Sequence, residues 1–214
     1  REISFHIVVR GLVLLILAAL LESPAFDLPR YYFGVISCIG VCFIIFSVYR
    51  RVPRNIILLI SLVIVLFHGY LSLSWIPATT DVARYLRVIL HEPNFNSWPY
   101  VGLYPIIPWV GVMGLGWCFG GVIRQLHVSF PKLRNTLLLT GVSSIALFFV
   151  VRWLNSYGNL LPRRGNTIID WLYVSKYPPD VAFLLWGLGC MCMFMALGLW
   201  IQEREIKNPL SDAL

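Results

Sequence analysis

The sequence has 214 residues, of which 58% are hydrophobic and 13% are charged, and its formal net charge is +7. Soluble domains average about 45–50% apolar and about 25% charged residues, so this composition excludes an ordinary soluble domain and indicates a membrane protein. The basic residues stand in short clusters between apolar runs, a pattern typical of anchoring at membrane surfaces, and nucleic acid is not an expected partner.

Six apolar runs are long enough to cross a bilayer, which takes about 20 mostly apolar residues in a helix. The runs are 3–22, 31–49, 55–76, 104–123, 135–153 and 181–201. They predict an all-α, polytopic transmembrane helical bundle, and we expect residues 1–214 to form a single membrane-embedded domain. Because the chain starts without methionine and stops without a closing element, we also expect it to be a fragment of a longer protein.

The first run carries an ionisable residue at membrane depth, which is by default a functional hypothesis. Arg10 lies about one third along the run. It either extends to the membrane surface or faces a cavity, where it can hold an anion such as phosphate. His6 lies one turn earlier on the same helical face, so the two residues can form a paired cationic site.

The loops predict the orientation of the chain. The short loops 50–54 and 124–134 each carry three basic residues and no acid. If all six runs span, both loops lie on one side, which the positive-inside rule makes cytoplasmic. The turn 23–30 and the long loops 77–103 and 154–180 then lie on the extracytoplasmic side. Loops of this length are uncommon and often functional.

Two features stand near the first long loop. His68, in the outer half of the third run, is more typical of a packing group than of a catalyst, and His91 is interpreted as a loop or surface residue. The stretch TTDVARYLRVILHE has apolar residues at nearly helical spacing and a start that Thr80 or Asp81 can cap. It predicts a short amphipathic helix near 80–91, lying on the membrane face or covering a cavity.

The fourth run contains LYPIIPWVGVMGLGWCFG at 103–120, in which prolines precede several glycines. One helical face collects Gly111, Gly114, Cys118 and Gly121, and Gly116 with Gly120 forms a GxxxG pair on nearly the opposite face. Small residues let membrane helices approach closely, so the pattern predicts neighbours packed on both sides. The prolines predict an extended aromatic entry at the extracytoplasmic surface.

The residues by themselves name no reaction. All five cysteines fall inside apolar runs, and no histidine or carboxylate stands beside them at metal-ligand spacing, so no metal is expected. No nucleophile elbow, thiol-enzyme pattern or phosphate-binding glycine loop occurs in the sequence.

A resemblance to a known family rests on four stretches: VVRGLVLLIL at 8–17, LYPIIPWVGVMGLGWCFG at 103–120, VRWLNSYG at 151–158 and SKYPPDVAFLLWGLG at 175–189. In this order and spacing they resemble the bacterial branch of the heparan-alpha-glucosaminide N-acetyltransferase catalytic-domain family, which is similar to the membrane acyltransferase 3 proteins. The family commonly has serine where this chain has Asp180. Its catalytic histidine is expected upstream of residue 1, so the catalytic residue is unknown here, and the fragment alone is expected to be inactive.

The resemblance implies a transferase of the bacterial inner membrane that moves an acetyl or other acyl group from cytoplasmic acyl-CoA to a sugar amine or hydroxyl on the extracytoplasmic side. The expected partners are the bilayer, acetyl-CoA or another acyl-CoA, and a glycan or amino-sugar acceptor, with a homodimer left open. Candidate residues for the acceptor side are Tyr104, Trp109, Asn155, Lys176 and Tyr177. Arg10 and His6 are candidates for the donor side.

Two alternatives stay open: a polytopic transporter or flippase-like protein, and a structural protein of envelope biosynthesis without covalent chemistry. A transporter more often shows paired broken helices in its two halves. This sequence shows one span interrupted by glycine and proline and no internal repeat. That difference favours the acyltransferase.

Overall fold

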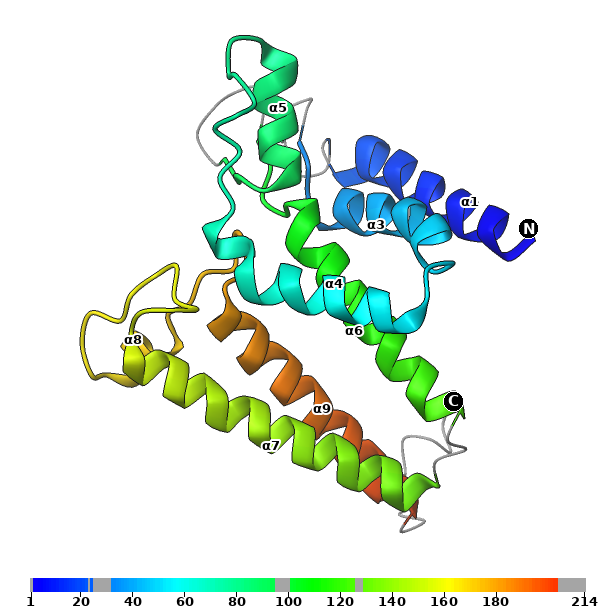
Figure 1. Cartoon of the computed structure of the whole chain (residues 1–214), viewed down its shortest axis with the longest axis vertical. Helices are drawn as coiled ribbons and strands as arrows, with labels where there is room; N and C mark the ends of the chain where they lie inside the picture. The colour runs from blue at the N-terminus through cyan, green and yellow to red at the C-terminus, as the bar shows by residue number, and fades with distance from the viewer. Residues whose placement is uncertain (1, 23, 25–31, 95–100, 126–128, 204–214) are drawn as a thin grey trace. The chain divides into compact units, whose positions relative to one another are not determined.

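The computed structural model describes residues 2–22, 24, 32–94, 101–125 and 129–203, and within them it consists of helices joined by loops (Figure 1). The only extended pairings among these residues are isolated bridges. The all-α prediction is therefore confirmed. The predicted turn 23–30 falls outside the described residues apart from Pro24, as do residues 95–100 of the first long loop.

The chain forms two compact units. The N-terminal unit comprises Arg1–Phe119 together with the turn Lys176–Pro179, and the C-terminal unit comprises Gly120–Ser175 and Asp180–Leu214. The turn therefore belongs to the N-terminal unit although both of its neighbours in sequence belong to the other one. The single membrane-embedded domain stays a prediction.

The helices follow the predicted apolar runs. In the N-terminal unit they are α1 (Glu2–Leu17), a π-helical continuation η1 (Ala18–Glu22), α3 (Val35–Tyr49), α4 (Arg54–Phe67), a 3₁₀ turn η2 (His68–Tyr70) and α5 (Asp81–Leu90). The glycine-rich α6 (Ile106–Gln125) starts in this unit and ends in the other. The C-terminal unit then contains α7 (Phe130–Leu154), the short α8 (Ile168–Leu172) and α9 (Val181–Glu203).

Helix α5 is the predicted amphipathic helix. Of the two caps proposed for it, the structure uses Thr80, whose hydroxyl oxygen accepts a hydrogen bond from the N–H of Ala83 at 3.3 Å. Val82 is 70% exposed on one face, whereas Val88 is buried on the other. This distribution confirms a helix with one apolar side turned inward and a second set of side chains left at the surface.

Four helical segments are long and apolar enough to cross a membrane, namely Glu2–Glu22, Ile106–Arg124, Phe130–Leu154 and Val181–Glu203. The helices of the second and third predicted runs are shorter than predicted. α3 begins only at Val35 because Phe33 is held in an extended bridge, and η2 ends at Tyr70 because Leu71 adopts an extended conformation. The prediction of six membrane spans holds only if these two shorter apolar helices also cross the membrane.

The second basic segment is more helical than predicted. α6 continues to Gln125 and α7 already begins at Phe130, with Pro131 in its first turn, where the missing N–H of proline does no harm. Lys132 and Arg134 therefore lie in the first turns of α7 and not in a loop spanning 124–134. Arg134 also forms an ion pair with Glu203 near the end of α9.

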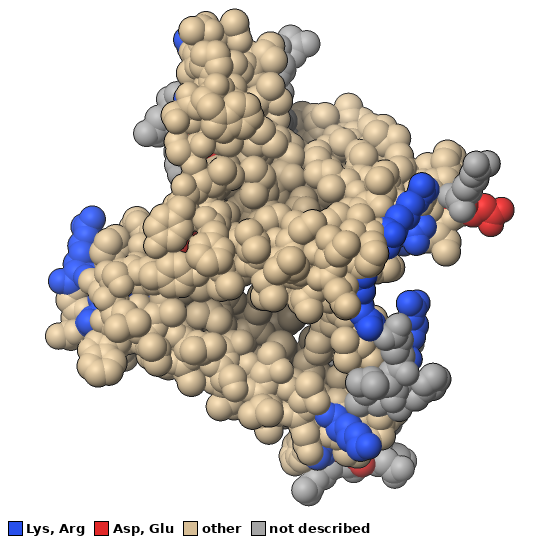
Figure 2. Space-filling model, viewed as in Figure 1, with Lys and Arg blue, Asp and Glu red and all other residues tan. Residues whose placement is uncertain are grey.

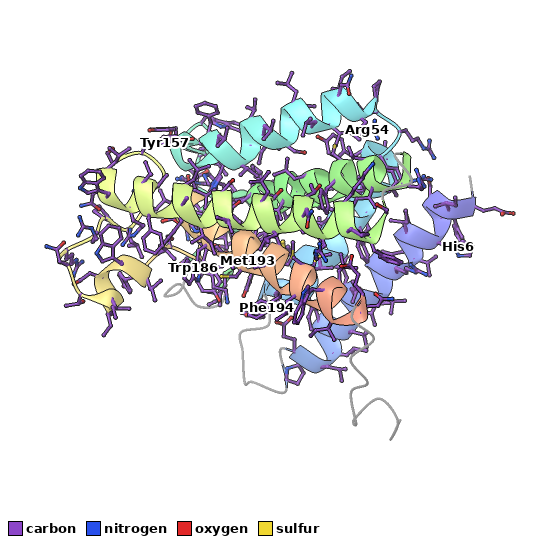
Figure 3. The ribbon with its side chains drawn as sticks, turned by 90° about the horizontal axis from the view of Figure 1, so that it is seen from below. His6, Arg54, Tyr157, Trp186, Met193 and Phe194 are labelled. Carbon is purple, nitrogen blue, oxygen red and sulfur yellow. The ribbon has the colours of Figure 1, made fainter. Side chains whose placement is uncertain are left out.

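Glycines mediate the closest helix contacts in both units. α1 and α3 lie side by side in opposite directions, as do α7 and α9 (Figures 1 and 3). A Cβ atom on Gly11 would lie 2.6 Å from the carbonyl oxygen of Gly40, and one on Gly141 would lie 2.9 Å from the carbonyl oxygen of Gly189. The backbones touch at these points, as is typical of membrane helices that pack through small residues.

The rest of the helical surface is largely apolar. Side chains such as Leu59, Leu139 and Phe194 are more than half exposed on α4, α7 and α9. The face seen in Figure 2 shows few charged side chains, and these lie toward its margins. Such a surface is stable in contact with lipid tails, which solvate apolar side chains while the helical backbone satisfies its own hydrogen bonds.

One face of α6 packs on α4 as predicted. A Cβ atom on Gly111 would come within 2.7 Å of Ile64, and one on Gly114 would overlap the hydroxyl group of Ser61. Cys118 completes this face by donating a weak hydrogen bond to the backbone carbonyl of Arg54.

A second packed face on α6 is not found among the described residues. Apart from the backbone of α6 itself, no described atom lies within 4 Å of where a Cβ would stand on Gly116 or Gly120. Gly116 and Arg10 line the same cavity, so the missing side chain of Gly116 leaves space in that cavity. The small residues of α6 therefore provide a contact on one side only.

The two faces of α6 predict different effects for the same substitution. Gly114→Ala is expected to lower the free energy of unfolding by about 1–3 kcal/mol, because the new methyl group would overlap the fully buried Ser61. Gly120→Ala should be neutral or slightly stabilising, because alanine has the higher helix propensity and meets open space. Thermal unfolding of both variants in detergent micelles measures the difference, and equal effects would contradict the one-sided packing.

Candidate functional site

A short extended crossing brings three distant segments of the N-terminal unit together. Phe33 pairs with Gly102 in a parallel bridge, and the N–H of Leu103 donates to the carbonyl of Phe33 at 3.1 Å. Gly102 also exchanges hydrogen bonds of 2.9 and 3.1 Å with Asn94. A Cβ on Gly102 would overlap Val88 of α5, so this close approach requires glycine. The crossing fixes the segment before α3 beside the segment before α6.

Four aromatic side chains and one lysine gather next to this crossing, and we call them the aromatic cluster: Tyr32, Tyr104, Trp109, Lys176 and Tyr177. The hydroxyl of Tyr177 donates to that of Tyr104 at 3.2 Å, and their rings meet edge to face with centroids 5.0 Å apart. The centroids of Tyr104 and Trp109 are 5.9 Å apart. The Lys176 ammonium nitrogen lies 5.4 and 5.2 Å from the ring centroids of Tyr104 and Tyr177. Four of the five predicted acceptor-side residues are thus neighbours.

Hydrogen-bond donors dominate the chemistry of the aromatic cluster. Burial, followed by the nearby Glu22, Tyr177 and Tyr104, raises the pKa of Tyr32 to about 12. Hydrogen bonds with the hydroxyl groups of Tyr104 and then Tyr177 raise the pKa of Lys176. At neutral pH the cluster therefore contains protonated hydroxyl groups and a lysine cation.

Trp109 adds one more donor to this set. Its indole nitrogen is buried and has no hydrogen-bond partner among the described residues. Aromatic rings combined with several donors suit a ligand that presents oxygen atoms at its edge and an apolar face to the rings.

Glu22 is a member of this neighbourhood that the sequence analysis missed. It ends η1, and its side chain reaches the Gly34 backbone at the start of α3, so a Cβ on Gly34 would overlap one carboxylate oxygen. The other oxygen, Oε2, is buried without a hydrogen-bond partner among the described residues. The available signal was its position, since Glu22 is one of only ten acidic residues and ends the same apolar run that carries Arg10.

Two histidines are buried beside the turn Lys176–Pro179. The ring of His68 bonds to the backbone of Pro179, and Nε2 of His91 donates to the carbonyl oxygen of His68 at 2.6 Å. Both side chains are only 4% exposed, and neither Nδ1 atom has a partner among the described residues. His91 does follow α5 as a loop residue, but its interpretation as a surface residue is wrong, because the side chain turns inward at the end of α5. The pair ties η2, α5 and the turn together.

Acidification is expected to loosen the His91 contact. Burial lowers the pKa of His91, against the opposing influence of the His68 carbonyl and Glu92. A histidine in water has a pKa of about 6.5, so when the contact is open the side chain takes up a proton below that pH. When the contact is closed the side chain takes up the proton less readily, so a lower pH favours the open state. The contact is therefore at full strength above about pH 6.5 and weakens as the pH falls below it. Hydrogen exchange of α5 from about pH 8 to about pH 5 measures this opening. The same pH dependence in His91→Gln would contradict the assignment.

Arg10 borders a cavity of about 370 Å³ in the N-terminal unit. Arg10 is the one charged residue in its lining, which otherwise consists of Ile7, Phe43, Phe46, Met113, Gly116 and Trp117. Arg10 is itself exposed, so both alternatives for this residue stay open. A guanidinium group in such surroundings is a strong hydrogen-bond donor for an anionic or carbonyl oxygen.

His6 does not line this cavity. Its side chain is exposed on α1 (Figure 3), and its ring packs edge to face with Phe5, with centroids 6.1 Å apart. The structure therefore does not bring His6 and Arg10 into one cavity, and a donor-side role for either residue stays a prediction.

Asn155 lies in the C-terminal unit and is engaged by the backbone. It ends α7 in the left-handed conformation with φ 51°, and its side-chain nitrogen donates to the carbonyl of Arg163 at 3.0 Å. The side-chain oxygen of Asn155 accepts a hydrogen bond from the backbone N–H of Arg163. Asn155 is thus not among the residues of the aromatic cluster, and its amide holds the loop 154–180. A role at the acceptor stays a prediction.

Asp180 anchors the ends of the turn that carries Lys176 and Tyr177. Its buried carboxylate accepts hydrogen bonds from the backbone N–H groups of Leu160 and Ser175, both at 3.2 Å, and of Phe183 at 2.7 Å. Its own N–H donates to the carbonyl of Ser175 at 2.9 Å. The residue that departs from the serine of the resembled family therefore has a structural role at the start of α9.

A family model described as heparan-alpha-glucosaminide N-acetyltransferase, catalytic, matches residues 3–152. The matched part includes Arg10, Tyr104 and Trp109, whereas Lys176 and Tyr177 lie beyond it. No curated protein and no solved structure matches the chain.

Proposed function

Because the chain belongs to the heparan-alpha-glucosaminide N-acetyltransferase catalytic family, we propose that it forms part of an integral membrane enzyme that moves an acetyl or other acyl group from acyl-CoA to a sugar amine or hydroxyl. The family and the long apolar helices agree on a membrane protein of acetyltransferase type. The observation that supports the finer proposal is the aromatic cluster, since it unites four residues that were expected at the acceptor.

The acceptor side of the proposed enzyme is the aromatic cluster. The rings of Tyr104, Trp109 and Tyr177 offer apolar faces on which a sugar can stack, and Lys176 with the tyrosine hydroxyls offers donors for its oxygen atoms. Donors of this kind also stabilise the oxyanion of a tetrahedral intermediate in acyl transfer. The cluster would therefore bind the acceptor and assist the reaction at the same place.

The donor side is proposed at the cavity beside Arg10. A mostly apolar cavity with one guanidinium suits a neutral acyl-bearing arm whose carbonyl or phosphate oxygen accepts from Arg10. Arg10 lies on α1. The basic loop 50–54 is attached to α1 as well, because Arg50 and Arg51 donate to the hydroxyl of Ser4 at 2.9 and 3.2 Å. We propose that this end, with the basic segments 50–54 and 124–134, is cytoplasmic in a bacterial inner membrane and that loops 77–103 and 154–180 are extracytoplasmic.

Acyl transfer itself tests the proposal. The complete natural polypeptide that carries this chain is reconstituted in proteoliposomes with acetyl-CoA labelled in the acetyl group on one side and a methyl glucosaminide or methyl glucoside on the other. Label on the amine or hydroxyl of the sugar is the expected result. If the sugar crosses the membrane without being acetylated, the protein is a transporter and not an acyltransferase. If the sugar is neither moved nor acetylated, a structural protein of envelope biosynthesis is favoured.

Arg10 is expected to contribute to binding of the donor. Arg10→Leu should raise the dissociation constant of acetyl-CoA about 10- to 100-fold, because a hydrogen bond to a charged group contributes about 1.5–3 kcal/mol. Arg84→Leu is a matched control, since Arg84 is an exposed arginine on α5. Equilibrium binding of labelled acetyl-CoA measures both. An unchanged affinity in Arg10→Leu would show that Arg10 extends to the membrane surface and does not bind the donor.

A further inference from the structure

Glu22 stands in the N-terminal unit with one carboxylate oxygen packed over Gly34 and the other buried. η1 ends at this residue, and the carboxylate lies over Gly34, the residue at the N-cap of α3. A helix N-terminus stabilises negative charge, and the Glu22 carboxylate lies beside one. Oε2 is nevertheless buried without a partner among the described residues. A buried carboxylate oxygen normally has a hydrogen-bond donor, so Oε2 is able to accept a hydrogen bond from a bound ligand.

The position of this carboxylate depends on a glycine. The Glu22 carboxylate and the ring edge of Tyr32 both lie within 3.0 Å of the place that a Cβ on Gly34 would take. Gly34 has φ −100° and ψ −165°, a conformation that any residue can adopt, so the requirement for glycine here is one of space and not of backbone geometry. Gly34 thus lets Glu22 and Tyr32 occupy adjoining positions.

Tyr32 connects Glu22 to the aromatic cluster. Its pKa is raised by the charge of Glu22 on one side and by Tyr177 and Tyr104 on the other, after the larger effect of burial. Glu22 is therefore the acidic member of a neighbourhood whose other polar groups are tyrosine hydroxyls, an indole N–H and an ammonium group. It supplies a proton acceptor where the tyrosines and Lys176 supply none at neutral pH.

We propose that Glu22 is a catalytic residue of the acyl transfer, acting as the base that receives the proton of the acceptor. This role rests on the proposed function. The N–H or O–H of the sugar donates to Oε2 of Glu22, and its nitrogen or oxygen forms a bond with the carbonyl carbon of the acyl thioester. The carbon–sulfur bond then breaks, and CoA leaves as the thiolate. The proton lost by the nucleophile passes to Oε2 and from there to water, and the thiolate takes up one proton from water, so Glu22 is again a carboxylate and charge and atoms balance without a redox step.

Removing only the basicity of Glu22 tests this role. In the complete polypeptide, Glu22→Gln keeps the size of the side chain, and we expect kcat to fall about 10²–10⁴-fold, the usual contribution of general base catalysis. The affinity for methyl glucosaminide, followed by quenching of tryptophan fluorescence, should change much less than kcat. Glu2→Gln is the matched control, because it removes an exposed carboxylate in the first turn of the same helix, and it should leave kcat unchanged.

Two further variants separate a base from a structural carboxylate. In Glu22→Ala, added formate should restore part of the lost kcat, because a small carboxylate can enter the vacated space. Gly34→Ala should lower kcat although Glu22 is intact, because the methyl group would displace the carboxylate.

The outcomes distinguish the two proposals. An active wild type with an equally active Glu22→Gln would overturn the role of Glu22 alone. A loss of kcat that parallels a loss of affinity for the sugar and is not rescued by formate would also overturn it, since Glu22 would then only support the fold or bind. A wild type that transfers acetyl to no sugar would overturn the proposed function, and the catalytic role of Glu22 with it.

Discussion

Replacing Arg152 with methionine is expected to lower the free energy of unfolding of the C-terminal unit by about 3–5 kcal/mol. Arg152 is fully buried, and its guanidinium makes five hydrogen bonds of 2.6–3.0 Å. The acceptors are the backbone carbonyls of Leu161, Asp170, Trp171 and Tyr173 and the side-chain oxygen of Asn159. One side chain at the end of α7 thus satisfies backbone groups along much of the loop 154–180.

The loss of stability in Arg152→Met arises from the hydrogen-bond acceptors that lose their donor. Methionine fills a similar volume but donates nothing, so the buried carbonyl groups would lose their partners, each at a cost of about 1–3 kcal/mol before the loop rearranges. The total loss of unfolding free energy is smaller than the sum, because the loop can rearrange so that some of these carbonyl groups bond to water. The loop itself should open, because Arg152 binds four of its backbone carbonyls, whereas Asn155 and Asp180 each hold fewer backbone groups of the loop.

Thermal unfolding and limited proteolysis of the loop 154–180 measure this effect. Arg164→Met is a matched control in the same loop, since Arg164 is exposed, and it should change the free energy of unfolding by less than about 0.5 kcal/mol. Similar stability and cleavage of the two variants would contradict the assignment of Arg152 as the anchor of the loop.

Replacing Lys176 with methionine is expected to reduce kcat/KM for the sugar about 10- to 100-fold with little change in stability. Lys176 is exposed, but the hydroxyl groups of Tyr104 and Tyr177 hold its ammonium and raise its pKa, so it stays a cation throughout the neutral range. A charge-assisted hydrogen bond to a ligand contributes about 1.5–3 kcal/mol, which corresponds to the expected loss.

Steady-state kinetics with methyl glucosaminide as acceptor measure the Lys176 effect. Lys132→Met, which removes an exposed lysine from the start of α7, is the control. Lys176→Arg should retain more activity than Lys176→Met, because it keeps the charge. If Lys176→Met were as active as Lys132→Met, the lysine would serve only as an interfacial anchor and not as a contact of the acceptor.

The candidate site was partly predictable because its residues cluster in two short motifs. Tyr104 and Trp109 stand in YPIIPW, and Lys176 and Tyr177 stand in KYPP, so a resemblance over those stretches was enough to name them. Asn155 was named for the same reason, but the structure places its amide on the backbone of Arg163. A motif shows which residues occur together and does not show which neighbour satisfies each polar group.

Other site residues carry no local signal. Glu22 looks like the polar end of an apolar run, and His91 looks like a loop residue after an amphipathic helix. Only the crossing of Phe33, Asn94 and Gly102 brings Tyr32, the neighbour of Glu22, close to Tyr104, and only the turn at Pro179 gives His68 its partner. Contacts between segments tens of residues apart depend on packing that one sequence does not specify locally.

The sequence by itself determined the helices, because a chain in lipid must satisfy its backbone within each apolar run and an apolar run of sufficient length can do so only as a helix. It also determined one glycine contact face of α6 and the capped start of α5, since both depend on residues a few positions apart. The tertiary structure alone decided that the second glycine face borders open space, that Arg152 and Asp180 hold the loop, and that Glu22 joins the aromatic cluster. The physical reason is that burial and hydrogen-bond partners are properties of the assembled fold, whereas helicity in a membrane is a property of each segment.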